Sequence, residues 1–175
     1  MADLESQRDA LAALHIEYLN WVSSGIHTAL NQSVEVLLGM PIPAYVNATI
    51  DRICGVAPPR GVFYLAKTHG DPAAMVGLSY LRDGVAEVKR LYVRPEYRGR
   101  RFGEACLRRV LQDARTFGYS QVMLDTAPFM YSARRLYKRC GFTPCGPYPE
   151  VETPMELHAS WVFMVCDLEE LALVT

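Results

Sequence analysis

Runs of apolar residues with two different periods predict where strands and helices lie. Short apolar runs rich in β-branched and aromatic residues predict three strands, at Val62–Ala66, Ala74–Leu81 and Val85–Val93. Asp83 and Gly84 lie between the last two and suit the positive φ angles of a tight hairpin turn. We therefore expect the second and third strands to pair antiparallel.

Apolar residues at helical spacing mark most of the remaining elements. They predict helices at Asp3–Val22, Asn31–Leu38, Ala44–Cys54 and Gly103–Phe117, and a further helix from Pro128 to Cys140. Glycines mark three helix ends: Gly25 after the first helix, Gly118 in a left-handed cap, and Gly141 after the last helix. His15 and Trp21 on the first helix are interpreted as packing residues.

The order of the later elements predicts a mixed sheet. A buried strand at Gln121–Asp125 follows a helix, and a right-handed crossover would place it parallel to Val85–Val93. Four prolines between Phe142 and His158 predict a long loop, and a strand buried on both faces is expected at Ser160–Asp167. The fold class is therefore α/β in the α+β sense, with a mostly antiparallel central sheet flanked by helices. We expect a single domain of residues 1–175.

Composition and charge exclude several classes of function. The formal net charge of −1 argues against a polycation that wraps nucleic acid, although Lys and Arg crowd between residues 89 and 101. No stretch reaches the roughly 18 apolar residues of a membrane span, and the N-terminus lacks a signal peptide's apolar region. A cytoplasmic protein is expected. The five cysteines show neither Cys-x-x-Cys spacing nor a His/Cys cluster, which indicates reduced thiols and no metal site.

The junction after the third strand carries the clearest chemical signal. Pro95 cannot donate to a sheet ladder, so the strand must stop near Val93, and a helix follows at once. Such a loop points backbone N–H groups and the helix dipole at one place, where Arg98, Arg100 and Arg101 add charge. We expect a phosphate site there; the alternative is a solvated basic loop. The Walker and dinucleotide glycine patterns are both absent.

The segment Leu91–Gly103 resembles a strand and an Arg/Gln-x-x-Gly-x-Gly/Ala loop of the GNAT acetyltransferase superfamily. That loop cradles the pyrophosphate of acetyl-CoA, so the resemblance implies acetyl-CoA as a co-substrate. Arg98 and Gly103 match, whereas Arg101 stands where the family usually has its central glycine. The cofactor-binding residues that the resemblance implies are Leu91, Tyr92, Val93, Arg98, Gly99, Arg100, Arg101, Phe102, Gly103 and Ser132.

A second segment is similar to another GNAT motif, Asn-x-x-Ala-x-x-Leu-Tyr-x-x-x-Gly-Phe. Here it reads Ala133-x-x-Leu136-Tyr137-x-x-x-Gly141-Phe142, and Met130 stands where the family often has an asparagine that touches the pantetheine. That hydrogen bond must be lost or supplied by a neighbour such as Ser132. The resemblance implies that Tyr137 protonates the departing thiolate; the alternative is a tyrosine that only packs against the sheet.

Two further groups complete the expected chemistry. Glu87 is a lone carboxylate in an apolar strand and is the candidate general base, directly or through a water. The alternative for Glu87 is an ion pair with Lys89 or Arg90. A backbone N–H near Leu91, where family members splay the strand, would stabilise the oxyanion.

We therefore expect an acetyl-CoA-dependent N-acetyltransferase that acts on an amine of a small molecule or peptide. The departures at Arg101 and Met130 leave open a non-catalytic module that binds acyl-CoA. The arginine cluster raises nucleic-acid binding as a third interpretation, and the net charge argues against it.

The acceptor and the assembly are less defined. Glu150, Glu152 and Glu156 lie in a segment without Lys or Arg and predict a positively charged acceptor, unless they form a solvated loop face. The second and third predicted helices are expected to form a wall of the acceptor site. A homodimer is also considered. Family members normally begin with a strand before the first helix, so that strand is missing or lies outside this sequence.

Overall fold

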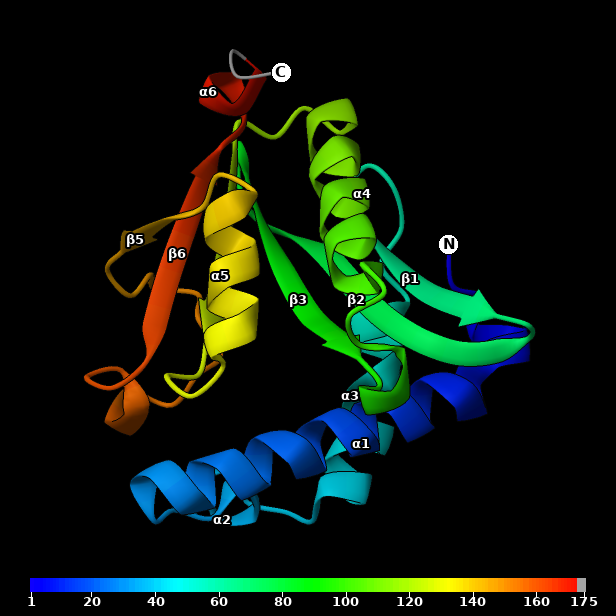
Figure 1. Ribbon diagram of the computed structural model, residues 1–175, viewed down its shortest axis with the longest axis vertical. Helices are drawn as coiled ribbons and strands as arrows, with labels where there is room; N and C mark the ends of the chain where they lie inside the picture. Colours follow the sequence, from blue (N-terminus) through cyan, green and yellow to red (C-terminus); the bar gives the residue numbers. More distant parts are fainter. Residues whose placement is uncertain (173–175) are drawn as a thin grey trace.

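One six-stranded sheet forms the centre of the molecule, and helices cover both of its faces (Figure 1). The computed structural model of the protein describes residues 1–172. In chain order the elements are α1 (Leu4–Leu30), α2 (Val34–Leu38), α3 (Ile42–Cys54), β1 (Gly61–Thr68), β2 (Asp71–Arg82), β3 (Val85–Val93), α4 (Phe102–Thr116), β4 (Gln121–Thr126), α5 (Tyr131–Arg139), β5 (Thr143–Cys145), β6 (Val162–Asp167) and α6 (Leu168–Ala172), with 3-10 turns at Pro95–Tyr97 and Met155–Leu157. The expected fold class is confirmed, and the single domain of residues 1–175 stays a prediction.

The strand order is β1-β2-β3-β4-β6-β5. Every neighbouring pair is antiparallel except β3 and β4, which are parallel. The β2–β3 hairpin turns at Asp83 and Gly84, and Gly84 has a φ of 75°, a region that glycine enters at little cost. The predicted hairpin and the predicted parallel pair are both confirmed.

β3 and β4 stay paired over a short distance only. Their ladder joins Val85, Ala86 and Glu87 to residues 121–123, and beyond it the strands part toward α1 (Figure 1). A bulge lies just past this point, where β3 has one more residue than β2 between Lys89 and Tyr92. Arg90 within the bulge has a left-handed φ of 58°. Because a bulge bends its strand, β3 turns away from β4 and the sheet opens at this end.

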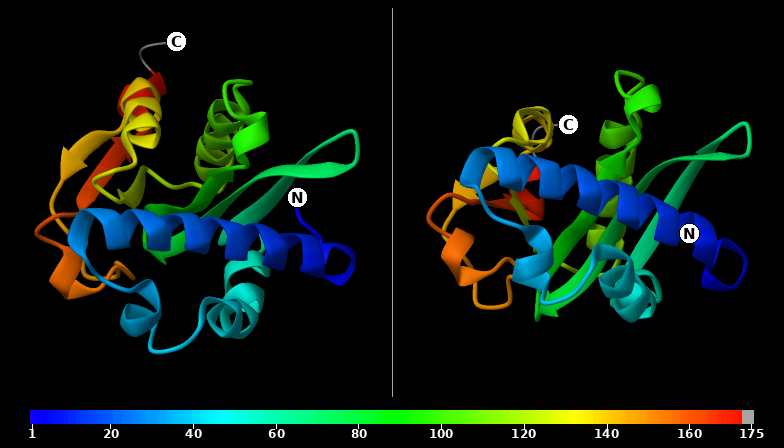
Figure 2. Two further views of the ribbon diagram at one scale, coloured as in Figure 1. Left: turned by 60° about the horizontal axis from the view of Figure 1, so that its bottom comes forward. Right: turned by 90° about the horizontal axis from the view of Figure 1, so that it is seen from below.

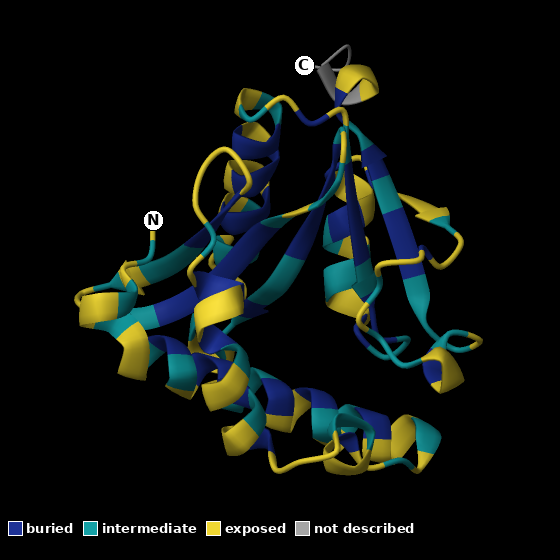
Figure 3. Ribbon diagram, turned by 180° about the vertical axis from the view of Figure 1, so that it is seen from behind, coloured by how far each residue is buried: buried dark blue, intermediate teal, exposed yellow. Residues whose placement is uncertain are grey.

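Alternate residues along the strands point to opposite faces of the sheet and form two apolar layers. The buried residues concentrate in these layers (Figure 3). On one face strand residues such as Val62 and Ala74 pack against α4 and α5, and on the other Phe63 and Met75 pack against α1 and α3. A further cluster joins the second half of α1 to Met130 and to residues near Leu157. α1 therefore crosses the opened end of the sheet and contacts both halves of the molecule (Figure 2).

α1 is longer than the sequence predicts. It continues through Gly25 to Leu30, and Asn31 ends it with a left-handed φ of 53°. Gly25 is a packing residue, since a Cβ there would overlap the ring of Phe129. The predicted end at Val22 was wrong because the partner that needs this glycine is distant in sequence. Because Asn31 ends α1, α2 begins at Val34 rather than at Asn31.

The start of α5 also differs from the prediction. The helix begins at Tyr131 rather than at Pro128, because the Met130 N–H bonds to the Ala127 carbonyl and closes a turn first. The turn carries Phe129 toward α1, where its ring meets Trp21 edge-on. Packing against α1 thus overrides the favourable placement of a proline in the first helical turn.

The segment between α5 and β6 is less irregular than expected. β5 lies within it and pairs with β6 although it contains Pro144, since an edge strand tolerates a residue without an N–H. β6 begins at Val162 rather than at Ser160. Val162, Val165 and Asp167 are only half-buried, so the expectation of a strand buried on both faces was wrong.

Some expectations concern side chains rather than elements. Cys54, Cys106, Cys140, Cys145 and Cys166 are free thiols, as predicted. His15 is 2% exposed and stacks on Phe63, which confirms it as a packing residue. Within residues 1–172, no helix combines the length and the apolar character that a membrane crossing requires. In the same part of the chain, no group of three or more His, Cys, Asp or Glu side chains is arranged to hold a metal ion.

Candidate active site

A cavity of about 660 Å³ lies where β3 and β4 part, and we call it the main cavity. Its walls come from the second half of β3, the loop and first turn of α4, the end of β4, and α5. Tyr18 and Trp21 of α1 close a further side. The main cavity brings together all of the predicted site residues except Glu87 and Arg100.

The loop between β3 and α4 leaves several backbone amides open. Gly99 and Arg101 both have left-handed φ angles, 77° and 64°, so Arg101 keeps the backbone conformation of a glycine. The first intrahelical bond joins the Ala105 N–H to the Arg101 carbonyl, so the amides of residues 102–104 have no acceptor within the helix. Among the described residues, no side chain caps them. Open amides at a helix N-terminus suit a phosphate group.

Arg98 is held over the same wall. Its Nε donates to the Val93 carbonyl at 3.1 Å, and its guanidinium carbon lies 5.3 Å from the Trp21 ring centre. Trp21, interpreted as a packing residue from the sequence, is 38% exposed and lines the main cavity, so that interpretation was incomplete. Arg100 is exposed and lies over the Tyr97 ring instead, outside the cavity lining.

Gly103 leaves space that the chain itself does not fill. A Cβ there would make ordinary contacts, 3.4 Å from Leu136 Cδ2 and 3.6 Å from Val93 Cγ2. Internal packing therefore does not require a glycine at this position. Because Gly103 lines the main cavity, the space beside its Cα is available to a bound molecule.

Tyr137 lies on the inner side of α5 and lines the main cavity. It is 6% exposed, and its ring packs against Phe142 with 5.9 Å between ring centres. Burial raises the pKa of its phenol, and Tyr18 and Asp125 raise it further. Tyr137 is therefore a neutral O–H donor at neutral pH. Ser132, at the start of the same helix, lines the same cavity.

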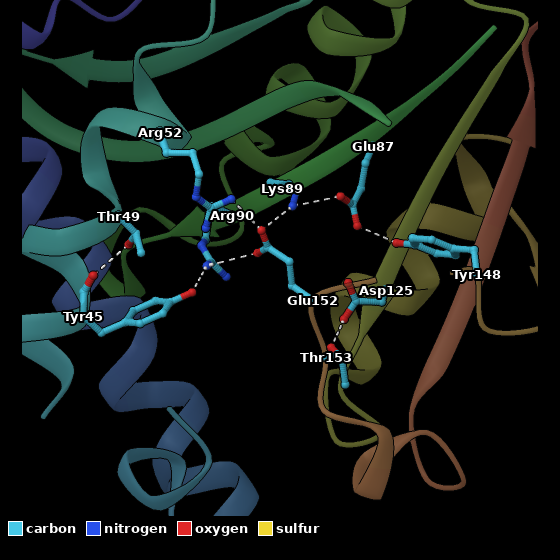
Figure 4. Close-up of polar contacts among 10 residues, drawn as sticks. All are labelled: Tyr45, Thr49, Arg52, Glu87, Lys89, Arg90, Asp125, Tyr148, Glu152 and Thr153. Atoms are coloured by element: carbon cyan, nitrogen blue, oxygen red, sulfur yellow. Dashed lines mark hydrogen bonds and ion pairs between the residues drawn. The ribbon is translucent and has the colours of Figure 1, made fainter. Parts of the chain in front are cut away.

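Glu87 is engaged by groups of the chain itself (Figure 4). The Tyr148 hydroxyl donates to Oε1 at 2.6 Å, and Lys89 Nζ lies 3.0 Å from Oε2. The residue is 2% exposed; burial raises the pKa of the carboxyl, and Lys89 works against that shift. Glu87 lines a second cavity of about 150 Å³, which we call the small cavity. The ion pair with Lys89 is present, and the role of general base stays a prediction.

Asp125 is a carboxylate that sequence reasoning missed. It lies near the end of β4 and lines both cavities. Trp161 Nε1 and Thr153 Oγ1 donate to its Oδ2, at 2.5 Å and 2.7 Å, and fix its orientation. The sequence offered one clue to this site: Asp125 is a charged residue near the end of a predicted buried strand that runs parallel to β3.

Glu152 fastens the segment before β6 to β3 and α3 (Figure 4). Its Oε1 lies 3.0 Å from Lys89 Nζ and 2.8 Å from Arg52 Nη1, and its Oε2 lies 3.9 Å from Arg90 Nη2. Burial disfavours the charged form, but Lys89 and Arg52 outweigh it and lower the pKa of Glu152 to about 2. Glu152 is therefore ionised and shared among three cations.

The other two glutamates of that segment lie apart from the main cavity. Glu150 pairs with Arg82 at 2.8 Å, and Glu156 is exposed. Two of the three carboxylates that predicted a cationic acceptor are thus neutralised within the chain. α2 and α3, which were expected beside the acceptor, contribute Val34, Leu37, Leu38 and Tyr45 to the small cavity.

Known proteins resemble this chain in sequence. It matches the family described as "Acetyltransferase (GNAT) family" over residues 38–142. An uncharacterized N-acetyltransferase of Schizosaccharomyces pombe is 39% identical over 93 residues, 52% of this chain and 57% of that protein. An IAA acetyltransferase of Azospirillum brasilense is 31% identical over 139 residues, 77% of this chain and 90% of that protein. Human N-acetyltransferase 8 is 37% identical over 89 residues, 48% of this chain and 39% of that protein.

The chain thus spans about half the length of the fission-yeast and human relatives. Solved structures share its fold. PaiA N-acetyltransferase from Thermoplasma acidophilum, solved with coenzyme A, gives a TM-score of 0.67 at 17% identity over 95% of each chain. An acetyltransferase from Streptococcus agalactiae gives 0.67 at 18% identity, over 90% of this chain and 91% of that one. The chain therefore belongs to the GNAT acetyltransferase family, as its two motifs predict.

Proposed function

We propose that the protein transfers the acetyl group of acetyl-CoA to an amine of a small molecule or peptide. The observation that carries the proposal is that one cavity combines the open helix N-terminus at Gly103 with the phenol of Tyr137. The first feature suits the pyrophosphate of acetyl-CoA, and the second suits the thiolate that leaves. Relatives named N-acetyltransferases support the same reaction.

Acetyl-CoA fits the main cavity as the donor substrate. The open amides of residues 102–104 and the Arg98 side chain would hold its diphosphate. In the described part of the chain, β3 has no β4 partner beyond Glu87, so its backbone groups are available to the amides of the pantetheine arm. Met130 cannot replace the family asparagine as a hydrogen-bond donor, whereas Ser132 on the same cavity can.

The transfer needs three groups. The amine nitrogen attacks the thioester carbonyl carbon, so a C–N bond forms and the C–S bond breaks. The amine gives its proton to a carboxylate, and the thiolate takes the proton of the Tyr137 hydroxyl. Exchange with solvent then removes the proton from the carboxylate and returns one to Tyr137. A backbone N–H at the β3 bulge near Leu91 would stabilise the oxyanion.

Two carboxylates compete for the amine proton. Glu87, the candidate from the sequence, has its two oxygens engaged by Tyr148 and Lys89 and lines only the small cavity. Asp125 lines both cavities, and its two hydrogen bonds end on a single oxygen. We therefore favour Asp125 as the base and treat Glu87 as a residue that positions the loop.

Amine-dependent release of the CoA thiol tests the proposed function. Purified protein, acetyl-CoA and a panel of amines and peptides should give thiol release that Tyr137→Phe lowers. Acetyl-CoA binding without release across the panel would instead support the non-catalytic acyl-CoA module. Absence of acetyl-CoA binding would contradict both functions.

The finer expectations about partners also stay proposals. A cationic acceptor loses support because Glu150 and Glu152 pair with cations of the chain. A homodimer, a cytoplasmic location, and the absence of nucleic-acid and membrane partners rest on the sequence.

A further inference from the structure

Arg90 occupies an unusual place in the fold. It lies in the β3 bulge with a left-handed backbone, and it lines both the main and the small cavity. Its side chain is only 16% exposed. Its Nε is buried and has no hydrogen-bond partner among the described residues. A buried guanidinium group that lacks acceptors is costly, so a ligand carboxylate that binds Arg90 would offset part of that cost.

The ion pairs around Arg90 join three cations to two carboxylates (Figure 4). Arg52, Lys89 and Arg90 share two carboxylates, those of Glu87 and Glu152. Lys89 and Arg52 take the short contacts, and Arg90 Nη2 is left 3.9 Å from Glu152 and 3.3 Å from the Tyr45 hydroxyl. One positive charge in this cluster therefore lacks a close carboxylate.

The small cavity next to Arg90 is lined by charged side chains, among them Glu87, Lys89 and Glu152, and by an apolar wall. The apolar wall consists of Leu19, Val22 and Ile26 of α1 and Val34, Leu37 and Leu38 of α2. The volume of about 150 Å³ is enough for a group of the size of a benzene ring. Asp125 lies on both cavities and offers a negative charge near the proposed transfer point. Arg90, Asp125 and the apolar wall thus present three kinds of contact to one bound molecule.

We propose that the acceptor is an amine that also carries a carboxylate and an apolar side chain, as an aromatic or large aliphatic amino acid does. Its carboxylate pairs with Arg90, its amino group meets Asp125, and its side chain fills the small cavity. This inference rests on the proposed function, because it names the acceptor of the same site. The proposal replaces the cationic acceptor with a zwitterionic one. A zwitterion suits this site because Arg90 supplies a positive group and Asp125 a negative one.

A pair of acceptors of nearly equal shape tests the carboxylate. L-Phenylalanine and L-phenylalaninamide differ in this group alone, and the amide has the more readily deprotonated amine. With the wild-type protein and saturating acetyl-CoA, kcat/KM for phenylalanine should exceed that for the amide about tenfold or more. Equal or reversed values would overturn the proposal, and this comparison does not depend on the folding of any variant.

Variants assign the effect to Arg90. Arg90→Gln should abolish the preference, mainly through a higher KM for phenylalanine. Arg82→Gln is the matched control, because Arg82 pairs with Glu150 of the same loop segment and lies outside the lining of both cavities. Arg82→Gln should keep the preference. A preference that survives in folded Arg90→Gln would contradict the assignment to Arg90.

A ligand without an amine separates this inference from the proposed function. 3-Phenylpropanoate has the carboxylate and the ring but cannot be acetylated. Calorimetry with CoA-bound protein should detect its binding to the wild type and to Arg82→Gln, and about tenfold weaker binding to Arg90→Gln. Binding with this pattern but without turnover of any amine would refute the transferase and keep the site. Turnover of amines without this binding would refute the site and keep the transferase.

Discussion

The Tyr148 hydroxyl donates a 2.6 Å hydrogen bond to Glu87 Oε1, and both residues are buried. Lys89 lies 3.0 Å from the other oxygen, so both oxygens of the carboxylate are engaged within the fold. Tyr148 precedes β6, whereas Glu87 lies at the last β3–β4 ladder position. The pair therefore fixes the segment before β6 at the point where the sheet begins to open.

Substitution of the two carboxylates should separate stability from turnover. Removing one partner of a buried ion pair typically costs about 3–5 kcal/mol, and Glu87→Gln should lie near or below the lower value because Lys89 keeps Glu152. Asp125→Asn should lower kcat about 100-fold or more through loss of the base. Urea unfolding and thiol release, measured on both variants, check this. A large loss of kcat in Glu87→Gln alone would return the base role to Glu87.

Tyr137→Phe should keep acetyl-CoA binding and lower turnover. The ring that packs against Phe142 is retained, and only the phenolic proton is lost. General acid catalysis typically contributes about 100-fold or more, so kcat should fall by that order. Tyr119→Phe is the matched control, since Tyr119 is a buried tyrosine whose hydroxyl meets the Arg60 carbonyl outside the main cavity. A change in kcat below about threefold for Tyr137→Phe would remove it from the mechanism.

Arg101→Gly should leave the fold at least as stable and the affinity for acetyl-CoA within a few fold. Its φ of 64° is strained for any residue with a Cβ, and its side chain is 88% exposed. Urea unfolding and calorimetry with acetyl-CoA measure the two effects. A loss of affinity beyond about tenfold, ~1.4 kcal/mol, would mean that the arginine itself grips phosphate.

Gly103→Ala should affect the ligand and not the fold. The added methyl group meets Leu136 and Val93 at ordinary distances, and alanine favours a helix by up to about 1 kcal/mol relative to glycine. It would occupy space that the diphosphate needs, so acetyl-CoA affinity should fall about tenfold or more. Gly146→Ala, at a site with no close neighbours, is the control. Unchanged affinity would show that the diphosphate does not approach Gly103.

His15 should make the protein less stable in mild acid. Burial lowers the pKa of His15 to about 4, below the ordinary value of 6.5. Between these values the unfolded chain binds a proton that the folded chain does not, so the free energy of unfolding falls as pH drops from about 6.5 to about 4. The full effect is about 3 kcal/mol, at ~1.4 kcal/mol per pKa unit.

His15→Phe keeps a ring against Phe63 and should lose this part of the pH dependence. Urea unfolding of both proteins at about pH 7 and about pH 5 checks the prediction. Parallel changes in stability for the two proteins would assign the acid sensitivity to another group.

Local signals explain why much of the fold could be predicted from the sequence. Asp83 and Gly84 specify their hairpin within two residues, and Pro95 ends β3 through its own chemistry. The loop from Arg98 to Gly103 is likewise a local pattern, so it identified one wall of the main cavity. Each of these signals acts over a few residues and does not depend on the rest of the chain.

Contacts between distant segments explain what the sequence did not reveal. Gly25 reads as a helix stop until Phe129 is placed against it, and Trp21 reads as a core residue until the sheet opens beside it. Asp125 gains its importance from facing both cavities, which requires the divergence of β3 and β4. The hydrogen bond between Tyr148 and Glu87 could not be predicted, because the two residues are distant in sequence and close in space.

The short ladder between β3 and β4 has a mechanical consequence. With three paired positions between β3 and β4, the two halves of the sheet are joined at one end and diverge toward the other. α1, 27 residues long, packs on one half of the molecule through Leu11 and Leu14 and on the other half through Leu19 and Val22. α1 therefore sets the angle between the two halves of the sheet. The close contact between Gly25 and the Phe129 ring fixes the second half of the helix in place.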